Sequence, residues 1–208
     1  STGKSFCAGA DLDWMRRVAA CSPEENLRDA RRLAELLSTL NELSKPTLAR
    51  VQGPAYGGGV GLIAACDIAI GTYDAVFALS EVKLGIIPAV ISPYVLAAIG
   101  ERYSRRYMLT AERFSAAEAY RIGLLHELVP GEEQLDEAIA EVVDSLLANG
   151  PRAQAECKAL IRVVAGQPID TETIDETAQR ITRVRASREG REGLAAFLEK
   201  RQPDWVTD

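Results

Sequence analysis

The residues of this 208-residue chain whose types and spacing could do chemistry lie in two short stretches. The first, AYGGGVGLIAACD over residues 55–67, places four glycines where an apolar helix should begin. Each helical glycine costs about 0.5–1 kcal/mol relative to alanine. Helix stability cannot explain them, so the pattern favours either a tight turn or a backbone that approaches a ligand closely. A dinucleotide phosphate site is disfavoured, because Leu62 stands where that pattern needs a further glycine.

The second stretch contains an acid/base candidate. Glu81 lies between Leu79 and Val82 in the largely apolar segment FALSEVKLGIIP, residues 77–88. Desolvation in such surroundings would raise the pKa of its carboxyl group and let it exchange protons near neutral pH. The alternative is an ordinary solvated glutamate in a loop. The single histidine, His126, has no neighbour in the sequence that would orient it, so we interpret it as a structural residue at a strand end.

Alternating helix and strand patterns must position these two stretches. Residues 24–43 repeat leucine at three- and four-residue steps, which predicts an amphipathic helix with one face packed inward. A strand over residues 47–51 then leads into the glycine-rich turn and a helix from about Val60. Strand patterns follow over residues 67–71 and 76–79. This order predicts parallel βαβ crossovers.

The remainder of the chain is mainly helical. We expect helices over residues 91–99, 103–109 and 116–122, with stops at Gly100 and Gly123. A strand over residues 124–130 follows. Helices then continue from residue 134, with breaks at residues 149–151 and 166–168. The fold class is therefore α/β. An α/β core over residues 1–130 is followed by a helical region over residues 131–208.

Composition narrows the classes of function. The formal net charge is −6 and no basic cluster is interleaved with aromatic residues, which argues against nucleic acid as a partner. The four cysteines show no CxxC spacing and only one histidine is present, so we expect no metal site and reduced thiols in the cytoplasm. No apolar run approaches 18 residues and no signal peptide is evident, so we expect no membrane partner. Small-molecule chemistry is favoured.

Five segments together resemble the crotonase (enoyl-CoA hydratase/isomerase) superfamily. They occur in family order and span the chain: SFCAGADL, KPTLARVQGPAYGGGVGLIAACDIAI, FALSEVKLGIIP, LTAERFSAAEAYRIGLLHELVP and AAFLEKRQP. The resemblance implies a spiral ββα core, whose first strands would precede Ser1, and homotrimers or homohexamers built through the C-terminal helices. Within the superfamily the chain looks most like bacterial hydratases of leucine and isoprenoid breakdown, which act on methylglutaconyl-CoA-type thioesters.

The resemblance also implies roles for individual residues. The backbone N–H groups of Ala8 and Gly58 would hold the thioester carbonyl oxygen, which gains negative charge as the substrate becomes an enolate. A Cβ atom on Gly57, Gly58 or Gly59 would then obstruct the approach of the thioester. Glu81 matches the family's second catalytic carboxylate, and it would position water and move a proton to the α-carbon.

Further substrate contacts follow from the same match. Ala10 and Leu12, like the glycines, would line the acyl-CoA site. Asp11 is expected to be the N-cap of a helix first, with support of the oxyanion loop as a lesser role. Near the C-terminus Phe197 would pack against adenine and Lys200 would approach phosphate, unless both belong to an ordinary amphipathic helix.

Two departures from the family pattern bear on the reaction. Gly61 stands where family hydratases usually carry a second glutamate, and AVISPYVL, residues 89–96, replaces a glycine-rich turn. A mechanism in which one carboxylate activates water and another protonates the α-carbon cannot operate unaltered.

We therefore expect an enoyl-CoA hydratase, a lyase that adds water to an α,β-unsaturated acyl-CoA, branched or carboxylated, with the coenzyme A thioester as substrate and no cofactor. An enoyl-CoA isomerase is the main alternative, because a 1,3-proton shift needs one base that removes and returns a proton. A decarboxylase or a non-catalytic acyl-CoA-binding protein would also fit these residues.

Overall fold

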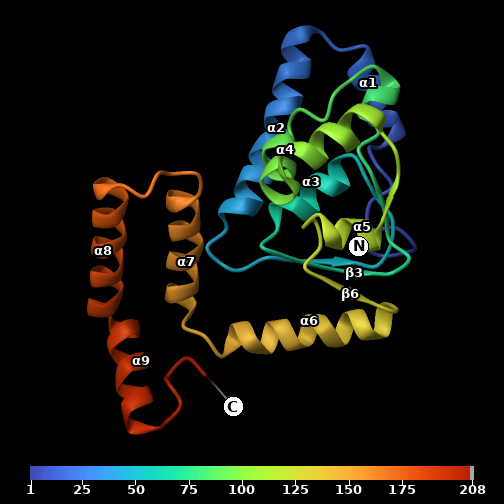
Figure 1. Cartoon of the computed structure of the whole chain (residues 1–208). Coiled ribbons are helices and arrows are strands. Elements are labelled where there is room, and N and C mark those ends of the chain that lie inside the picture. The colour runs from blue at the N-terminus through green and yellow to red at the C-terminus, as the bar shows by residue number, and fades with distance from the viewer. Residues whose placement is uncertain (207–208) are drawn as a thin grey trace. The chain divides into compact units, whose positions relative to one another are not determined.

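The computed structural model describes residues 1–206, which contacts divide into two compact units (Figure 1). The first, here the core unit, comprises residues 1–41 and 47–139. The second, here the helical unit, comprises residues 42–46 and the chain from residue 140. The division falls inside a helix, nine residues beyond the boundary at residue 130 that the sequence patterns suggest. None of the helices in residues 1–206 is both long enough and apolar enough to cross a membrane.

The core unit holds both sheets and most of the helix-to-strand junctions. Its elements are α1 (Leu12–Ala19), α2 (Pro23–Glu42), β1 (Leu48–Val51), β2 (Ala55–Tyr56), α3 (Gly58–Ala65), β3 (Ile68–Thr72), β4 (Val76–Ala78), the 3-10 helix η1 (Glu81–Leu84), α4 (Ser92–Thr110), β5 (Phe114–Ser115), α5 (Ala116–Arg121), β6 (Glu127–Val129) and the start of α6 (Glu132–Leu147). The helical unit contains the rest of α6 with α7 (Pro151–Val164), α8 (Thr171–Ala186) and α9 (Arg188–Glu199).

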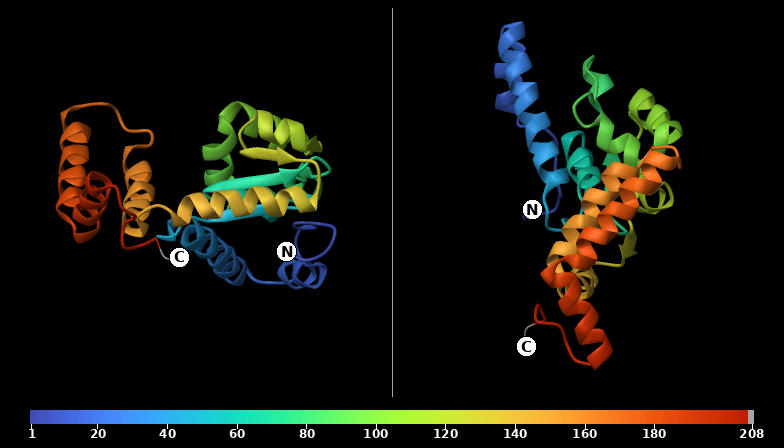
Figure 2. Two further views of the ribbon diagram at one scale, coloured as in Figure 1. Left: turned by 90° about the horizontal axis from the view of Figure 1, so that it is seen from below. Right: turned by 90° about the vertical axis from the view of Figure 1, so that its left-hand side faces the viewer.

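Two three-stranded sheets organise the core unit. In one, β3 lies between β1 and β6 and pairs in parallel with both. In the other, β4 pairs in parallel with β2 and antiparallel with β5. Because β2 and α3 lie between β1 and β3 along the chain, the β1–β3 pair is the parallel crossover that the sequence predicts. The left view of Figure 2 shows strands of the core unit with helices beside them.

The core lies where α3 and α4 pack on the strands. Val60, Ile63 and Val95 are at most 1% exposed and belong to one buried cluster with Phe77 of β4, which is fully buried. The Phe77 ring stacks on Phe114 with centroids 5.5 Å apart. Burial of such side chains removes apolar area from water at about 25 cal/mol per Å². This packing fixes the β2–α3 and β4–η1 junctions against each other.

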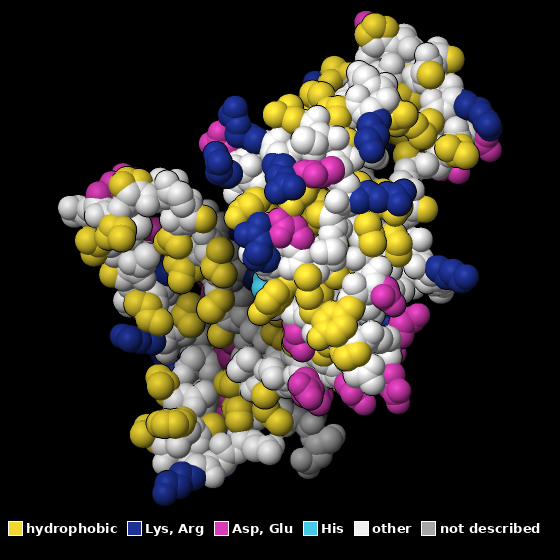
Figure 3. All heavy atoms as spheres, turned by 45° about the vertical axis from the view of Figure 1, so that its right-hand side comes forward, with side chains coloured by type: hydrophobic (Ala, Val, Ile, Leu, Met, Phe, Trp, Pro, Cys, Tyr) yellow, Lys and Arg dark blue, Asp and Glu magenta, His cyan; other side chains and the backbone are white. Residues whose placement is uncertain are grey.

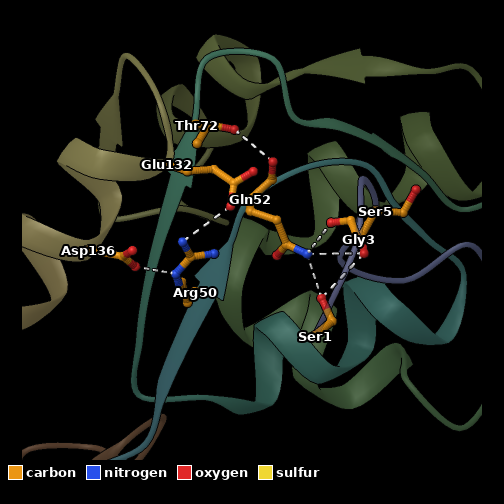
Figure 4. A network of polar contacts seen from close by, with 8 residues as sticks. All are labelled: Ser1, Gly3, Ser5, Arg50, Gln52, Thr72, Glu132 and Asp136. Carbon is orange, nitrogen blue, oxygen red and sulfur yellow. Dashed lines mark hydrogen bonds and ion pairs between the residues drawn. The ribbon is translucent and has the colours of Figure 1, made fainter.

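A buried amide fastens the segment that precedes α1 (Figure 4). Gln52, 8% exposed, donates from Nε2 to Ser1 Oγ at 2.7 Å and to the carbonyl oxygens of Gly3 and Ser5, both at 3.2 Å. A buried amide that lost these acceptors would pay its full desolvation cost. The N-terminal segment is therefore held beside the end of β1. On the other side of the same strand, the Arg50 guanidinium pairs with Asp136 of α6.

Several elements differ from the sequence expectations. Helix α3 begins at Gly58, two residues before the expected Val60. The two helices expected over residues 91–109 form one element, α4, with a kink at Gly100, whose φ is 73°. The strand expected over residues 124–130 is confined to Glu127–Val129. The strands β2 and β5, of two residues each, are too short to produce a period-two pattern.

The expectation of one inward-packed leucine face on the helix of residues 24–43 is largely wrong for the single chain. Only Leu37 of α2 is buried. Leu27, Leu33, Leu36 and Leu43 are 38–51% exposed, because no other segment of the core unit covers that face. Figure 3 shows apolar side chains on the surface beside scattered basic and acidic ones. Hydrophobic periodicity predicts a helix correctly here but does not say what covers it.

Candidate active site

A cavity of about 510 Å³ in the core unit brings four chain segments together. They are the N-terminal segment with α1, the β2–α3 junction, the β4–η1 junction with the residues after it, and the segment between α4 and β5. The residues that line the cavity are Ala8, Gly9, Ala10, Leu12, Trp14, Met15, Tyr56, Gly57, Gly58, Ala78, Ser80, Glu81, Lys83, Leu84, Ile86 and Arg113.

Gly57 makes the turn between β2 and α3. Its φ of 53° and ψ of −117° lie where a side chain is strained, and it stands as the N-cap of α3. Its N–H donates to Ala78 O at 2.9 Å, which ties the turn to the end of β4. A Cβ atom here would lie 3.0 Å from Glu81 Oε1. The glycine therefore lets the turn and the carboxyl group of Glu81 approach each other.

The backbone N–H groups of Ala8 and Gly58 belong to residues that line the cavity, and neither has an acceptor within residues 1–206. Cys7 holds Ala8 beside the turn, since its N–H donates to Pro54 O at 3.1 Å and its carbonyl accepts from Tyr56 N–H at 3.0 Å. The Gly58 N–H belongs to the first turn of α3, where the helix presents positive partial charge. Such donors can stabilise negative charge on a ligand oxygen.

Among residues 1–206, Glu81 supplies the one carboxyl group that lines this cavity. It starts η1 and is half-buried, and its Oε2 is buried without a hydrogen-bond partner in the described part of the chain. Burial disfavours the charged carboxylate and raises the pKa of Glu81 above its usual value, an effect that a hydrogen bond from its own backbone N–H partly opposes. A carboxyl group of this kind can take up and release a proton closer to neutral pH.

Comparison with known proteins agrees with this geometry. The sequence matches the family described as enoyl-CoA hydratase/isomerase over residues 1–208. The chain belongs to that family. The fold is similar to the crystal structure of an enoyl-CoA hydratase from Shewanella pealeana, with a TM-score of 0.95 and 51% identity over 98% of this chain and 76% of that one. The crotonase fold expected from the sequence is confirmed.

Curated relatives within the enoyl-CoA hydratase/isomerase family have more than one activity in their names. A crotonyl-CoA hydratase of Syntrophomonas wolfei is 32% identical over all of this chain and 78% of its own length. A peroxisomal Delta(3,5)-Delta(2,4)-dienoyl-CoA isomerase of Arabidopsis thaliana is 28% identical over 97% of this chain and 76% of its own length. Membership of the family therefore does not by itself determine the reaction, which has to be inferred from the residues of the site.

Glycine occurs at positions 58, 59 and 61 of this family member for different physical reasons. A Cβ atom on Gly58 would meet nothing within 4 Å and would project into free space. On Gly59 it would lie 2.5 Å from Cys7 Cβ, and on Gly61 it would lie 2.6 Å from Ile91 Cβ. The expectation that a Cβ on Gly59 would obstruct the thioester is therefore wrong, because the Cys7 side chain already fills that side.

Most of the site residues predicted from the sequence come together. Ala8, Ala10, Leu12, Gly57, Gly58 and Glu81 all line the cavity. Asp11 is absent from the lining, and its Oδ1 accepts from Trp14 N–H at 2.7 Å, so its predicted N-cap role is confirmed. His126 Nδ1 accepts from Ala69 N–H at 3.0 Å, which fits its interpretation as a structural residue beside β6.

The two predicted coenzyme contacts belong to the helical unit. Phe197 is 80% exposed near the end of α9, and Lys200 ends that helix in the left-handed conformation with φ of 56°. Their contacts with adenine and phosphate stay predictions.

Sequence reasoning missed several lining residues that carry polar groups. Tyr56 directly precedes the glycine triplet, so its place beside the β2–α3 turn could have been found from adjacency. Lys83 follows Glu81 on η1 and could have been found in the same way. Arg113 comes from the segment between α4 and β5, far along the chain, and no local pattern marks it.

Proposed function

We propose that this protein is an enoyl-CoA hydratase, which adds water across the double bond of an α,β-unsaturated acyl-CoA. The observation that carries the proposal is the position of the Glu81 carboxyl group on the same cavity as the free N–H groups of Ala8 and Gly58. An acid/base group beside a pair of oxyanion donors is what enolate chemistry on a thioester requires. The similarity to proteins named as hydratases supports the same reaction.

In the proposed mechanism the thioester carbonyl oxygen accepts hydrogen bonds from the Ala8 and Gly58 N–H groups. The Glu81 carboxylate removes a proton from water while the water oxygen bonds to the β-carbon. The electron pair of the double bond moves toward the carbonyl, and the two donors stabilise the enolate oxygen more than the ground-state carbonyl. The protonated Glu81 then gives its proton to the α-carbon, so that the net change is the addition of one water molecule.

The mechanism assigns both proton transfers to one carboxyl group. Gly61 has no side chain, and Ile91 fills the space beside it, so no second carboxyl group is available at that position. This feature also favours the second candidate, an enoyl-CoA isomerase, in which Glu81 removes a proton from one carbon and returns it to another. The similarity to a dienoyl-CoA isomerase supports that alternative.

The proposal extends to the substrate and the assembly. The sequence resemblance to hydratases of leucine breakdown supports a branched, methylglutaconyl-like acyl group. Apolar side chains exposed on the helical unit, among them Ile161 at 64% and Ile174 at 57%, support a homotrimer or homohexamer.

Turnover in heavy-oxygen water tests the function. Crotonyl-CoA and 3-methylglutaconyl-CoA are each incubated with the full chain, with an enzyme-free blank, and the products are analysed by fragment mass spectrometry. Hydration predicts heavy oxygen on the β-carbon. An unlabelled product with a shifted double bond would contradict the hydratase and support the isomerase. Binding of acyl-CoA without turnover would contradict both enzymes and support a non-catalytic binding protein.

A further inference from the structure

Arg113 places a positive charge on the wall of the cavity that contains Glu81. It follows α4 and directly precedes β5, and its side chain is exposed. Its guanidinium carbon lies 5.6 Å from the centroid of the Tyr56 ring, and Tyr56 lines the same cavity. A guanidinium over an aromatic face is attracted to the negative potential of the ring. The contact holds the cation beside the β2–α3 turn.

The charge of Arg113 is not neutralised within the described part of the chain. The neighbouring arginines each have a carboxylate partner: Arg106 pairs with Glu112 at 2.6 Å, and Arg121 pairs with Glu118 at 2.6 Å. Arg113 forms no ion pair or hydrogen bond with any residue of 1–206. Glu112, its neighbour in sequence, is already occupied by Arg106. The guanidinium therefore keeps all five N–H donors for a ligand.

We propose that Arg113 binds a second carboxylate at the distal end of the substrate's acyl chain. The inference rests on the proposed function, because it assumes that the acyl chain occupies the cavity with Glu81. A planar guanidinium binds a carboxylate through two parallel N–H···O bonds, a geometry that no lysine can offer. The preferred substrates of the site are therefore enoyl-CoA thioesters of dicarboxylic acids.

A dicarboxylic substrate also explains why an unpaired cation lines the same cavity as the acid. A substrate carboxylate would be repelled by ionised Glu81, and a cation that binds this carboxylate offsets the repulsion. Lys83 is the other basic residue on the lining, and its exposed side chain on η1 provides a matched comparison. A phosphate group of coenzyme A could also supply the anion for Arg113, and thioesters with and without a terminal carboxylate separate the two sources.

The test uses two pairs of thioesters that differ only in a terminal carboxylate in place of a methyl group. Glutaryl-CoA and pentanoyl-CoA are saturated and cannot react, so calorimetric dissociation constants for them do not depend on turnover. Glutaconyl-CoA and pent-2-enoyl-CoA give the corresponding kcat/KM values. Both pairs are measured with the full chain and with Arg113→Gln, Arg113→Lys and Lys83→Gln, after circular dichroism has shown that each variant is folded.

Arg113→Gln is expected to weaken glutaryl-CoA binding at least tenfold and to leave pentanoyl-CoA binding within twofold. Arg113→Lys should keep part of the preference for glutaryl-CoA over pentanoyl-CoA, and Lys83→Gln should keep all of that preference. If Arg113→Gln weakened the binding of glutaryl-CoA and pentanoyl-CoA equally, Arg113 would be assigned to coenzyme A and the proposal would be overturned. An unchanged ratio of the two dissociation constants in Arg113→Gln would also overturn it. So would a loss of glutaryl-CoA binding that occurs only in Lys83→Gln. Absence of turnover with an intact effect on binding would refute the proposed function and leave the carboxylate site standing.

Discussion

The side chain of Ile91 occupies the space that a side chain on Gly61 would need. A Cβ atom on Gly61 would lie 2.6 Å from Ile91 Cβ, and both residues are buried. Two departures from the family pattern, the missing glutamate at position 61 and the apolar segment over residues 89–96, are therefore one packing feature. The contact joins α3 to the start of α4, and among residues 1–206 Glu81 is the single residue with a carboxyl group on the cavity.

The first prediction concerns this contact. Gly61→Ala should destabilise the protein by about 1–3 kcal/mol through overpacking, as measured by urea unfolding. In an Ile91→Ala background the same change should be neutral or stabilising, because the neighbour is gone and alanine is the better helix former. Gly58→Ala is the matched control in the same helix, since its Cβ meets nothing within 4 Å and the substitution should leave stability unchanged or raise it slightly. Additive effects of the two substitutions would show that Gly61 and Ile91 do not share this space.

Gly58→Val should reduce activity far more than stability. The added side chain would project into the cavity and keep the thioester carbonyl away from the Gly58 N–H. Loss of one oxyanion donor typically lowers kcat about 10²–10³-fold, whereas the melting temperature should change little. Steady-state kinetics with thermal unfolding of the same sample check both parts. Near-normal turnover would remove Gly58 from the oxyanion site.

The buried carboxyl group should also make stability depend on pH. Burial raises the folded-state pKa of Glu81, so its contribution to stability is complete below the unfolded-state pKa and is lost as the pH rises through the folded-state pKa. Glu81→Gln, which stays neutral, should match the wild-type melting temperature in acid and exceed it at pH 8. Glu133→Gln, at an exposed position of α6, is the control. A similar pH response of both variants would argue against a buried charge at Glu81.

The chain should assemble with copies of itself. The helical unit exposes Phe197 at 80% and Leu198 at 77%, besides other apolar residues of α7 and α8. Exposed apolar surface of this kind is typical of an interface. Light scattering at micromolar concentration should give a mass of three or six chains, and a stable monomer would contradict the prediction.

Local features of the site could be predicted from the sequence, and features made by distant packing could not. The Asp11 cap depends on residues within one helical turn, so its pattern is visible. The reasons for glycine at positions 59 and 61 lie in Cys7 and Ile91, which are far along the chain. Short strands such as β2 also leave no periodic pattern, although β2 positions the turn at the centre of the site.

The role proposed for Arg113 also depends on packing between distant segments and could not be predicted from the sequence. Its ring contact, Tyr56, is 57 positions earlier, and the two segments come together because β4 pairs with both β2 and β5. A sequence pattern could identify Glu81 by its apolar neighbours, but no pattern marks a cation whose role comes from the absence of a carboxylate partner within residues 1–206.

The kcat of Glu81→Gln decides whether a single carboxyl group performs the reaction. Because that group carries out both proton transfers, the variant should hydrate crotonyl-CoA at least about a hundredfold more slowly than the wild type. Binding of butyryl-CoA, measured by calorimetry, should remain within a few-fold because the Ala8 and Gly58 N–H groups are intact. Glu133→Gln should retain full activity. Unimpaired turnover by Glu81→Gln would refute the single-carboxylate mechanism.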